Sequence, residues 1–256
     1  LASLQAAGVM EESRTHVLRS EALPISICCD AFQDMYARGD LLDVVIRVTD
    51  GHEEDAQNDG SGHLADGSGE QLLAHMCVLA VASPVLRKML TGGFKESRQR
   101  ELDASGMRVI TLHEVCAAQV KGLLEWIYTG TVTAHSMLEL MLLGKLADAL
   151  LVDQLHDKVK QHVLSCVTHE TCADILQCAH HTGLSDIKDA ASTYALKHFD
   201  HVARTPGFLI LCEPLLGALL ASDLLEASSE ETVYEHVLKW ILTTQDSSPG
   251  DDDDEE

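Results

Sequence analysis

Three consecutive residues, Phe94-Lys95-Glu96, stand directly after a glycine pair that ends a helical pattern. Glycine stops a helix because it adopts the left-handed conformation that closes the last turn. An aromatic side chain in such a loop can bury a large area in a partner's pocket, and a neighbouring glutamate adds a directional, charge-assisted hydrogen bond. This spacing is therefore compatible with a protein-binding site. The alternative is that Phe94 folds back over its own helix and Glu96 is solvated.

Histidine and cysteine side chains form a second chemically notable group. His162, Cys166 and His169 follow an i, i+4, i+7 spacing and would share one face of a helix. Structural zinc sites usually contain closer cysteine pairs of the C-x2-C type, and the sequence has none. A break expected near residues 167–168 also divides these side chains between two helices. We therefore predict ordinary helical packing here, with no metal site and no cofactor.

The sequence contains no recognisable catalytic signature. Residues 60–69 are rich in glycine but lack the lysine and the strand-to-helix context that a phosphate-binding loop needs. No G-x-S-x-G nucleophile motif occurs, and no pair of carboxylates stands out from the helical surface pattern. We predict that the chain is not an enzyme.

Charge and composition exclude further classes. The 256 residues include 41 acidic and 18 basic side chains, a formal net charge of −23, which disfavours binding to nucleic acid or to an acidic membrane surface. Much of the acidity lies in the loop 50–70 and in the tail 251–256. The eight cysteines lie largely within apolar helical patterns and no secretion signal is visible, so we expect a reducing compartment, the cytoplasm or the nucleus. The most apolar stretches are interrupted by charged residues, which disfavours a transmembrane span. Because the chain begins at Leu1, we expect it to be a fragment.

The hydrophobic pattern changes along the chain from mixed to helical. It predicts strands over 42–48, 72–74 and 107–112, a first helix over 25–36, and a helical stretch from residue 75 that restarts at Ser83-Pro84. A further helix ends at Gly130. Six helices are then expected over 136–150, 153–165, 169–181, 186–199, 206–221 and 230–243. The predicted architecture is a small α+β unit followed by a helical array.

The order of short motifs in the first part resembles the BTB (POZ) domain. The matching runs are Leu41-Leu42-Asp43-Val44, Ala74-His75, Val78-Leu79-Ala80, Ser83-Pro84, Glu96-Ser97, Ile110–Leu112 and Ile127-Tyr128-Thr129-Gly130. The following part is similar to the BACK domain, through Ile175, Ala179, Gly183, Ala195, Phe199, Val202, Phe208 and Leu211. The resemblance covers about residues 23–244. It implies an α+β BTB/POZ domain, helices with a small sheet, followed by an all-α BACK helical array.

The domain ranges expected from this resemblance cover the whole chain. They are an N-terminal extension at 1–22, a BTB/POZ domain at 23–160 containing the acidic loop 50–70, a BACK domain at 161–245, and an acidic tail at 246–256.

The resemblance implies a function as well as a fold. BTB-BACK proteins commonly act as dimeric substrate adaptors of cullin-3 ubiquitin ligases, and other domains such as Kelch or MATH recruit the substrate. In that family a hydrophobic-X-Glu motif after the third helix contacts cullin, which implies cullin-3 contacts for Phe94 and Glu96. Tyr128 is a third candidate contact, with packing in the core as its alternative. The family's dimerisation implies a homodimer interface on the apolar stripe of the first helix, made by Ile25, Cys28, Phe32 and Met35.

An alternative reading keeps the dimer without the cullin contact, as a BTB-mediated scaffold or transcriptional co-regulator. It is favoured by the absence of a visible substrate module in residues 1–24 or after Ser247. Against the transcriptional version, Met76 stands where the family usually has Arg or Lys, so the charged pocket that binds corepressors lacks its cation. Asp43 is then expected to hydrogen-bond backbone near a helix start. The sequence does not identify the substrate.

Overall fold

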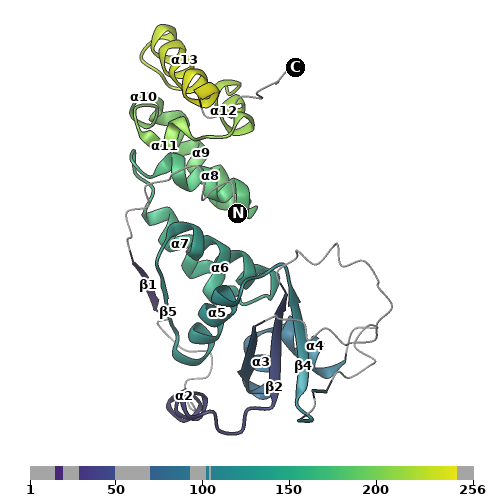
Figure 1. Cartoon of the computed structure of the whole chain (residues 1–256). Coiled ribbons are helices and arrows are strands. Elements are labelled where there is room, and N and C mark those ends of the chain that lie inside the picture. Colours follow the sequence, from purple (N-terminus) through teal and green to yellow (C-terminus); the bar gives the residue numbers. More distant parts are fainter. Residues whose placement is uncertain (1–14, 20–28, 50–69, 93–101, 104, 247–256) are drawn as a thin grey trace, which may run out of the picture. The chain divides into compact units, whose positions relative to one another are not determined.

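The chain divides into two compact units, each described here by itself (Figure 1). The computed structural model describes residues 15–19, 29–49, 70–92, 102–103 and 105–246. The first unit comprises residues Thr15–Val159, and the described part of the second comprises residues 160–246.

The first unit contains a three-stranded sheet (Figure 1). Its middle strand, β2 (Val44–Thr49), pairs antiparallel with β3 (Gln71–Ala74) and parallel with β4 (Arg108–His113). These are the three strands predicted from the hydrophobic pattern. Three consecutive residues of β2, Val44, Val45 and Ile46, are buried, because this strand packs on both faces of the sheet.

A second, two-stranded sheet was not predicted. It pairs β1 (His16–Arg19) antiparallel with β5 (Thr131–Ala134), and His16 lies opposite Ala134. Each strand has four residues, which is too short for alternation of apolar and polar residues to stand out from its surroundings. The pairing joins segments more than a hundred residues apart, so no local sequence pattern predicts it.

Helices make up most of the rest of the described part of the first unit. They are α2 (Cys29–Arg38), α3 (Met76–Ala82), α4 (Pro84–Thr91), α5 (Ala117–Thr129), α6 (Met137–Ala149) and α7 (Asp153–Ser165), whose last turns belong to the second unit. The predicted interruption at Ser83-Pro84 is confirmed. The Ser83 hydroxyl accepts a hydrogen bond from the Leu86 N–H at 3.0 Å, and donates one to the Leu150 carbonyl. Ser83 therefore caps α4 while Pro84 occupies the first helical position, where its missing N–H costs nothing.

The second unit is helical throughout its described part. Its helices are α8 (Cys172–Thr182), α9 (Ser185–Lys197), α10 (Phe199–Val202), α11 (Pro206–Leu209), α12 (Glu213–Leu220) and α13 (Glu230–Asp246). The expectation of one helix over 206–221 was wrong, because α11 ends at Leu209 and α12 begins at Glu213. Cys212 is extended and Pro214 lies in the first turn of α12, so the chain restarts there as it does at Pro84.

Asp174 introduces a charge into the packing of this unit. Desolvation by burial raises the pKa of the Asp174 carboxyl above its ordinary value. The folded state therefore binds this proton more tightly than the unfolded state does. Its contribution to stability is greatest below the ordinary carboxyl pKa and declines as the pH rises through the raised value.

Replacing Asp174 with asparagine is expected to raise the free energy of unfolding at pH 7, because the neutral amide avoids the cost of burying a charge. The difference between variant and wild type should shrink as the pH falls below the ordinary carboxyl pKa, where wild-type Asp174 is protonated in both states. Urea titrations from pH 4 to pH 8 measure this difference, with the exposed Asp189→Asn on α9 as the matched control. A stabilisation that does not vary with pH would contradict the assignment.

Candidate protein-interaction site

The end of α4 places the predicted binding motif at a helix terminus. Gly92 has φ 78°, and its N–H donates to the Lys88 carbonyl, which closes the last turn. The predicted stop is thereby confirmed at Gly92. Phe94 and Glu96 lie outside the described residues, so their contribution to cullin-3 binding stays a prediction.

Tyr128, the third predicted cullin contact, is buried near the end of α5 with 2% of its surface exposed. Its hydroxyl oxygen lies 2.9 Å from the His75 backbone nitrogen and 2.8 Å from His75 Nδ1. Desolvation raises the pKa of Tyr128, so the hydroxyl keeps its proton at neutral pH. A direct contact with a partner would require the hydroxyl to leave these bonds.

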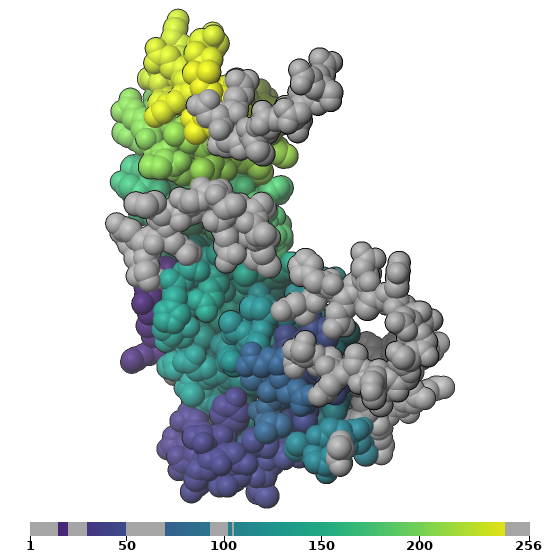
Figure 2. Space-filling model, viewed as in Figure 1, coloured from purple at the N-terminus to yellow at the C-terminus, as the bar shows by residue number. Residues whose placement is uncertain are grey.

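The predicted dimer residues are divided between described and undescribed parts of the chain. Ile25 and Cys28 lie outside the described residues, whereas Phe32 and Met35 lie half-buried on α2. Figure 2 shows the α2 side chains, in purple, on the surface of the first unit. The Phe32 ring meets the His75 imidazole edge to face, with centroids 5.8 Å apart. This contact leaves part of Phe32 exposed, as an interface residue requires.

Asp43 makes the contact that was predicted for it. Its Oδ1 accepts a hydrogen bond from the Met76 backbone N–H at 2.6 Å, at the first residue of α3. A carboxylate at a helix N-terminus satisfies an otherwise unpaired donor and interacts favourably with the helix dipole. Met76 itself is 37% exposed.

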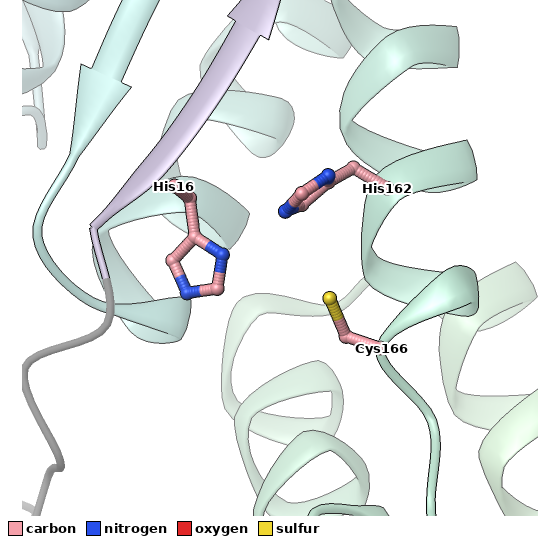
Figure 3. Close-up of side chains that lie close together, drawn as sticks. All are labelled: His16, His162 and Cys166. Carbon is pink, nitrogen blue, oxygen red and sulfur yellow. The ribbon is translucent and has the colours of Figure 1, made fainter.

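The histidine and cysteine residues considered as metal ligands occupy two structural settings. His162 lies in the last turn of α7, and Cys166 directly follows the end of that helix (Figure 3). His16, which was not predicted as a ligand, belongs to β1 of the first unit. His169 lies in the connection to α8, where its ring contacts the three side chains of Tyr194, His198 and His201. The expected break between His162 and His169 is confirmed, because α7 ends at Ser165. The absence of a metal site stays a prediction.

The aromatic cluster around His169 was not predicted from the sequence. The Tyr194 hydroxyl lies 3.3 Å from His169 Nδ1, and the centroids of His198 and His201 lie 5.0 Å and 4.8 Å from that of His169. Tyr194, His198 and His201 are spaced i, i+4, i+7, which is the signal that could have placed them on one face. Their meeting with His169 depends on the turn between α7 and α8.

Among the helices that the structure describes, none combines the length and the apolar character needed to cross a bilayer.

Comparison with known proteins matches two stretches of the chain to described domain families. The family model described as "BTB/POZ domain" matches residues 63–166, and that described as "BACK: BTB And C-terminal Kelch" matches residues 172–249.

Individual relatives match most of the chain. Kelch repeat and BTB domain-containing protein 8 of Xenopus tropicalis is 27% identical over 213 residues, which is 83% of this chain and 31% of the relative. Kelch-like protein 17 of Homo sapiens is 29% identical over 211 residues, which is 82% of this chain and 28% of the relative. Kelch-like protein 2 of Homo sapiens is 29% identical over 187 residues, which is 69% of this chain and 28% of the relative. The chain thus spans less than a third of the length of these relatives.

Proposed function

Because this chain belongs to the BTB-BACK proteins, we propose that it acts as a dimeric substrate adaptor of a cullin-3 ubiquitin ligase. The observation that carries the proposal is the succession of a BTB/POZ domain and a BACK domain in one chain, with Kelch-like relatives. In this role the chain binds cullin-3 through its BTB domain and the start of BACK. It performs no catalysis itself and holds a substrate close to the recruited ubiquitin-transfer machinery, a proximity effect. We place this activity in the cytoplasm or the nucleus.

The proposed cullin contact uses Phe94 as an apolar anchor and Glu96 as a directional acceptor. The position of the motif supports this role, because Gly92 ends α4 just before it. A buried aromatic anchor typically supplies a large share of the binding energy of an interface. The proposed homodimer uses the α2 stripe that includes Phe32 and Met35. A symmetric dimer presents two substrate sites and so raises avidity through effective concentration.

Binding to the N-terminal domain of cullin-3 tests the proposal. The double variant Phe94→Ala/Glu96→Ala is expected to weaken binding by about 100-fold, since loss of an anchor and of a charge-assisted hydrogen bond each costs about 1–2 kcal/mol or more. Isothermal titration calorimetry measures the affinity, and light scattering checks that the dimer persists.

Lys95→Ala is the matched control, because it removes a long side chain from the same segment without removing the anchor or the acceptor. We expect it to change the affinity less than about threefold, as is usual for residues outside a hot spot. If a folded wild-type dimer fails to bind, the adaptor proposal is wrong. If Lys95→Ala weakens binding as much as the double variant does, the assignment of the contact to Phe94 and Glu96 is wrong. A dimer without cullin binding would correspond to the scaffold alternative.

A further inference from the structure

Two buried side chains of the first unit, His75 and Tyr128, form a hydrogen-bond network at the start of α3. His75 is 3% exposed and precedes Met76, the first residue of α3. Its backbone N–H and its Nδ1 both meet the Tyr128 hydroxyl, and its Nε2 lies 2.9 Å from the Asp40 carbonyl oxygen. The turn after α2, the residue that precedes α3 and the last turns of α5 thus meet at one imidazole and one phenol.

The hydrogens of this network can be assigned without leaving a group unpaired. The His75 backbone N–H donates to the Tyr128 hydroxyl oxygen, so the single hydroxyl hydrogen is available for Nδ1. With Nδ1 as acceptor, the imidazole carries its hydrogen on Nε2 and donates it to the Asp40 carbonyl. Removing the Tyr128 hydroxyl leaves one buried donor and one buried acceptor of His75 without their partner.

The same two residues hold α2 by three further contacts. The Tyr36 ring stacks on the Tyr128 ring, with centroids 4.1 Å apart and planes 12° apart. Gln33 Nε2 donates to the Tyr128 backbone carbonyl at 2.8 Å, which satisfies a carbonyl in the last turn of α5. The Phe32 ring meets the His75 ring.

The chain just after α2 is also fixed to His75, through Asp40. Gly39 has φ 73°, and the Asp40 N–H donates to the Met35 carbonyl, so the chain turns sharply there. This turn presents the Asp40 carbonyl to His75 Nε2 at 2.9 Å.

We infer that Tyr128 and His75 are positioning residues for α2, holding the helix in the orientation that presents Phe32 and Met35 to a second copy of the chain. The positioning of α2 follows from the contacts within one unit. Its consequence for dimerisation rests on the proposed function. This assignment gives Tyr128 an indirect role, exerted through α2, in place of a direct contact with cullin.

Hydrogen exchange in α2 tests the inference directly. Tyr128→Phe keeps the ring stack and removes the hydroxyl. It is expected to speed exchange of the α2 amides by about tenfold or more, because a buried donor and a buried acceptor of His75 lose their partner. Exchange in α6, which lies outside the network, should change by less than about twofold. Sedimentation equilibrium should show the dimer weakened by a similar factor.

Tyr36→Phe is the matched control, since it removes the hydroxyl from the other ring of the same stack. No hydrogen bond to the Tyr36 hydroxyl is found among the described residues, so neither exchange in α2 nor dimer affinity should change. His75→Asn provides a second variant. Its amide oxygen replaces Nδ1 as an acceptor but it cannot reach the Asp40 carbonyl, and exchange should accelerate most at the C-terminal end of α2.

The outcomes separate this inference from the proposed function. Unchanged α2 exchange in Tyr128→Phe overturns the positioning role, whatever the oligomeric state. If the wild-type chain is monomeric and Tyr128→Phe still accelerates exchange in α2 more than in α6, the positioning role is retained and the proposed dimer is overturned. Accelerated exchange spread equally over α2 and α6 marks general destabilisation and also overturns the inference.

Discussion

Replacing Gly144 with alanine is expected to destabilise the first unit by about 1–3 kcal/mol, the range found for overpacking a filled core. Gly144 lies on the buried face of α6. A Cβ there would lie 2.8 Å from Val159 Cγ1 and 3.4 Å from Val159 Cβ, on α7. Valine cannot move aside easily, because its branched Cβ has one strongly preferred rotamer in a helix. Val159 is itself 1% exposed, so the strain falls on tightly packed neighbours.

Tryptophan fluorescence can measure the unfolding of the first unit alone. The chain has two tryptophans, Trp126 in the first unit and Trp240 in the second, so a Trp240→Phe background leaves Trp126 as the reporter. Urea unfolding of this background, with and without Gly144→Ala, gives the change in free energy. Unfolding at the same midpoint in both would show that α6 and α7 do not approach as closely as described.

A double variant separates steric overlap from loss of helix geometry. Val159→Ala removes both Cγ atoms, so Gly144→Ala should cost at least about 1 kcal/mol less in that background than in wild type. Gly217→Ala on α12 is the matched control for the substitution itself. An added Cβ there meets nothing within 4 Å, and alanine should stabilise that helix by about 0.5–1 kcal/mol.

Replacing Gly207 with alanine is expected to have a comparable effect in the second unit, lowering its free energy of unfolding by about 1–3 kcal/mol. A Cβ at this buried position of α11 would lie 2.5 Å from Asp174 Oδ1 and 3.3 Å from Ala173 Cβ, both on α8. The carboxylate must rotate away, but it already lies in a desolvated environment that raises its pKa. The new methyl group therefore displaces a group with few alternative positions.

Hydrogen exchange of the α8 and α11 amides measures this effect within the second unit. Exchange there should accelerate in Gly207→Ala, while exchange in the strands of the first unit should not. Asp174→Ala removes the overlapping carboxylate, so it should restore slow exchange to the Gly207→Ala chain. If Asp174→Ala gives no rescue, the overlap with the carboxylate is not the cause.

Much of the fold could be predicted because it depends on local chemistry. The β2 pattern, the restart at Ser83-Pro84 and the stop at Gly92 each reflect interactions within a few residues. The contact of Asp43 with the start of α3 joins residues 33 positions apart, and it was predicted because a helix N-terminus needs an acceptor. Helix boundaries in the second unit were less accurate where Pro214 begins a new helix inside an apolar run.

The candidate site could be predicted only in part. Residue type and motif order identified Phe94 and Glu96 as candidates, and those positions await the binding experiment. Motif order also pointed to Tyr128 but could not say which way its side chain faces. The periodicity of α5 is apolar on several sides, so burial of Tyr128 was left open until its neighbours were known.

Periodicity and capping residues indicated an α+β unit followed by a helical array, and the order of motifs carried the resemblance to the BTB and BACK domains that the family models match. Pairings over long sequence separations were decided by the tertiary structure, as shown by β1 with β5 and by Tyr128 with His75 and Tyr36. The physical reason is that secondary structure follows from neighbouring side chains. A buried hydroxyl or a close approach of two helices depends on residues that only the folded chain brings together.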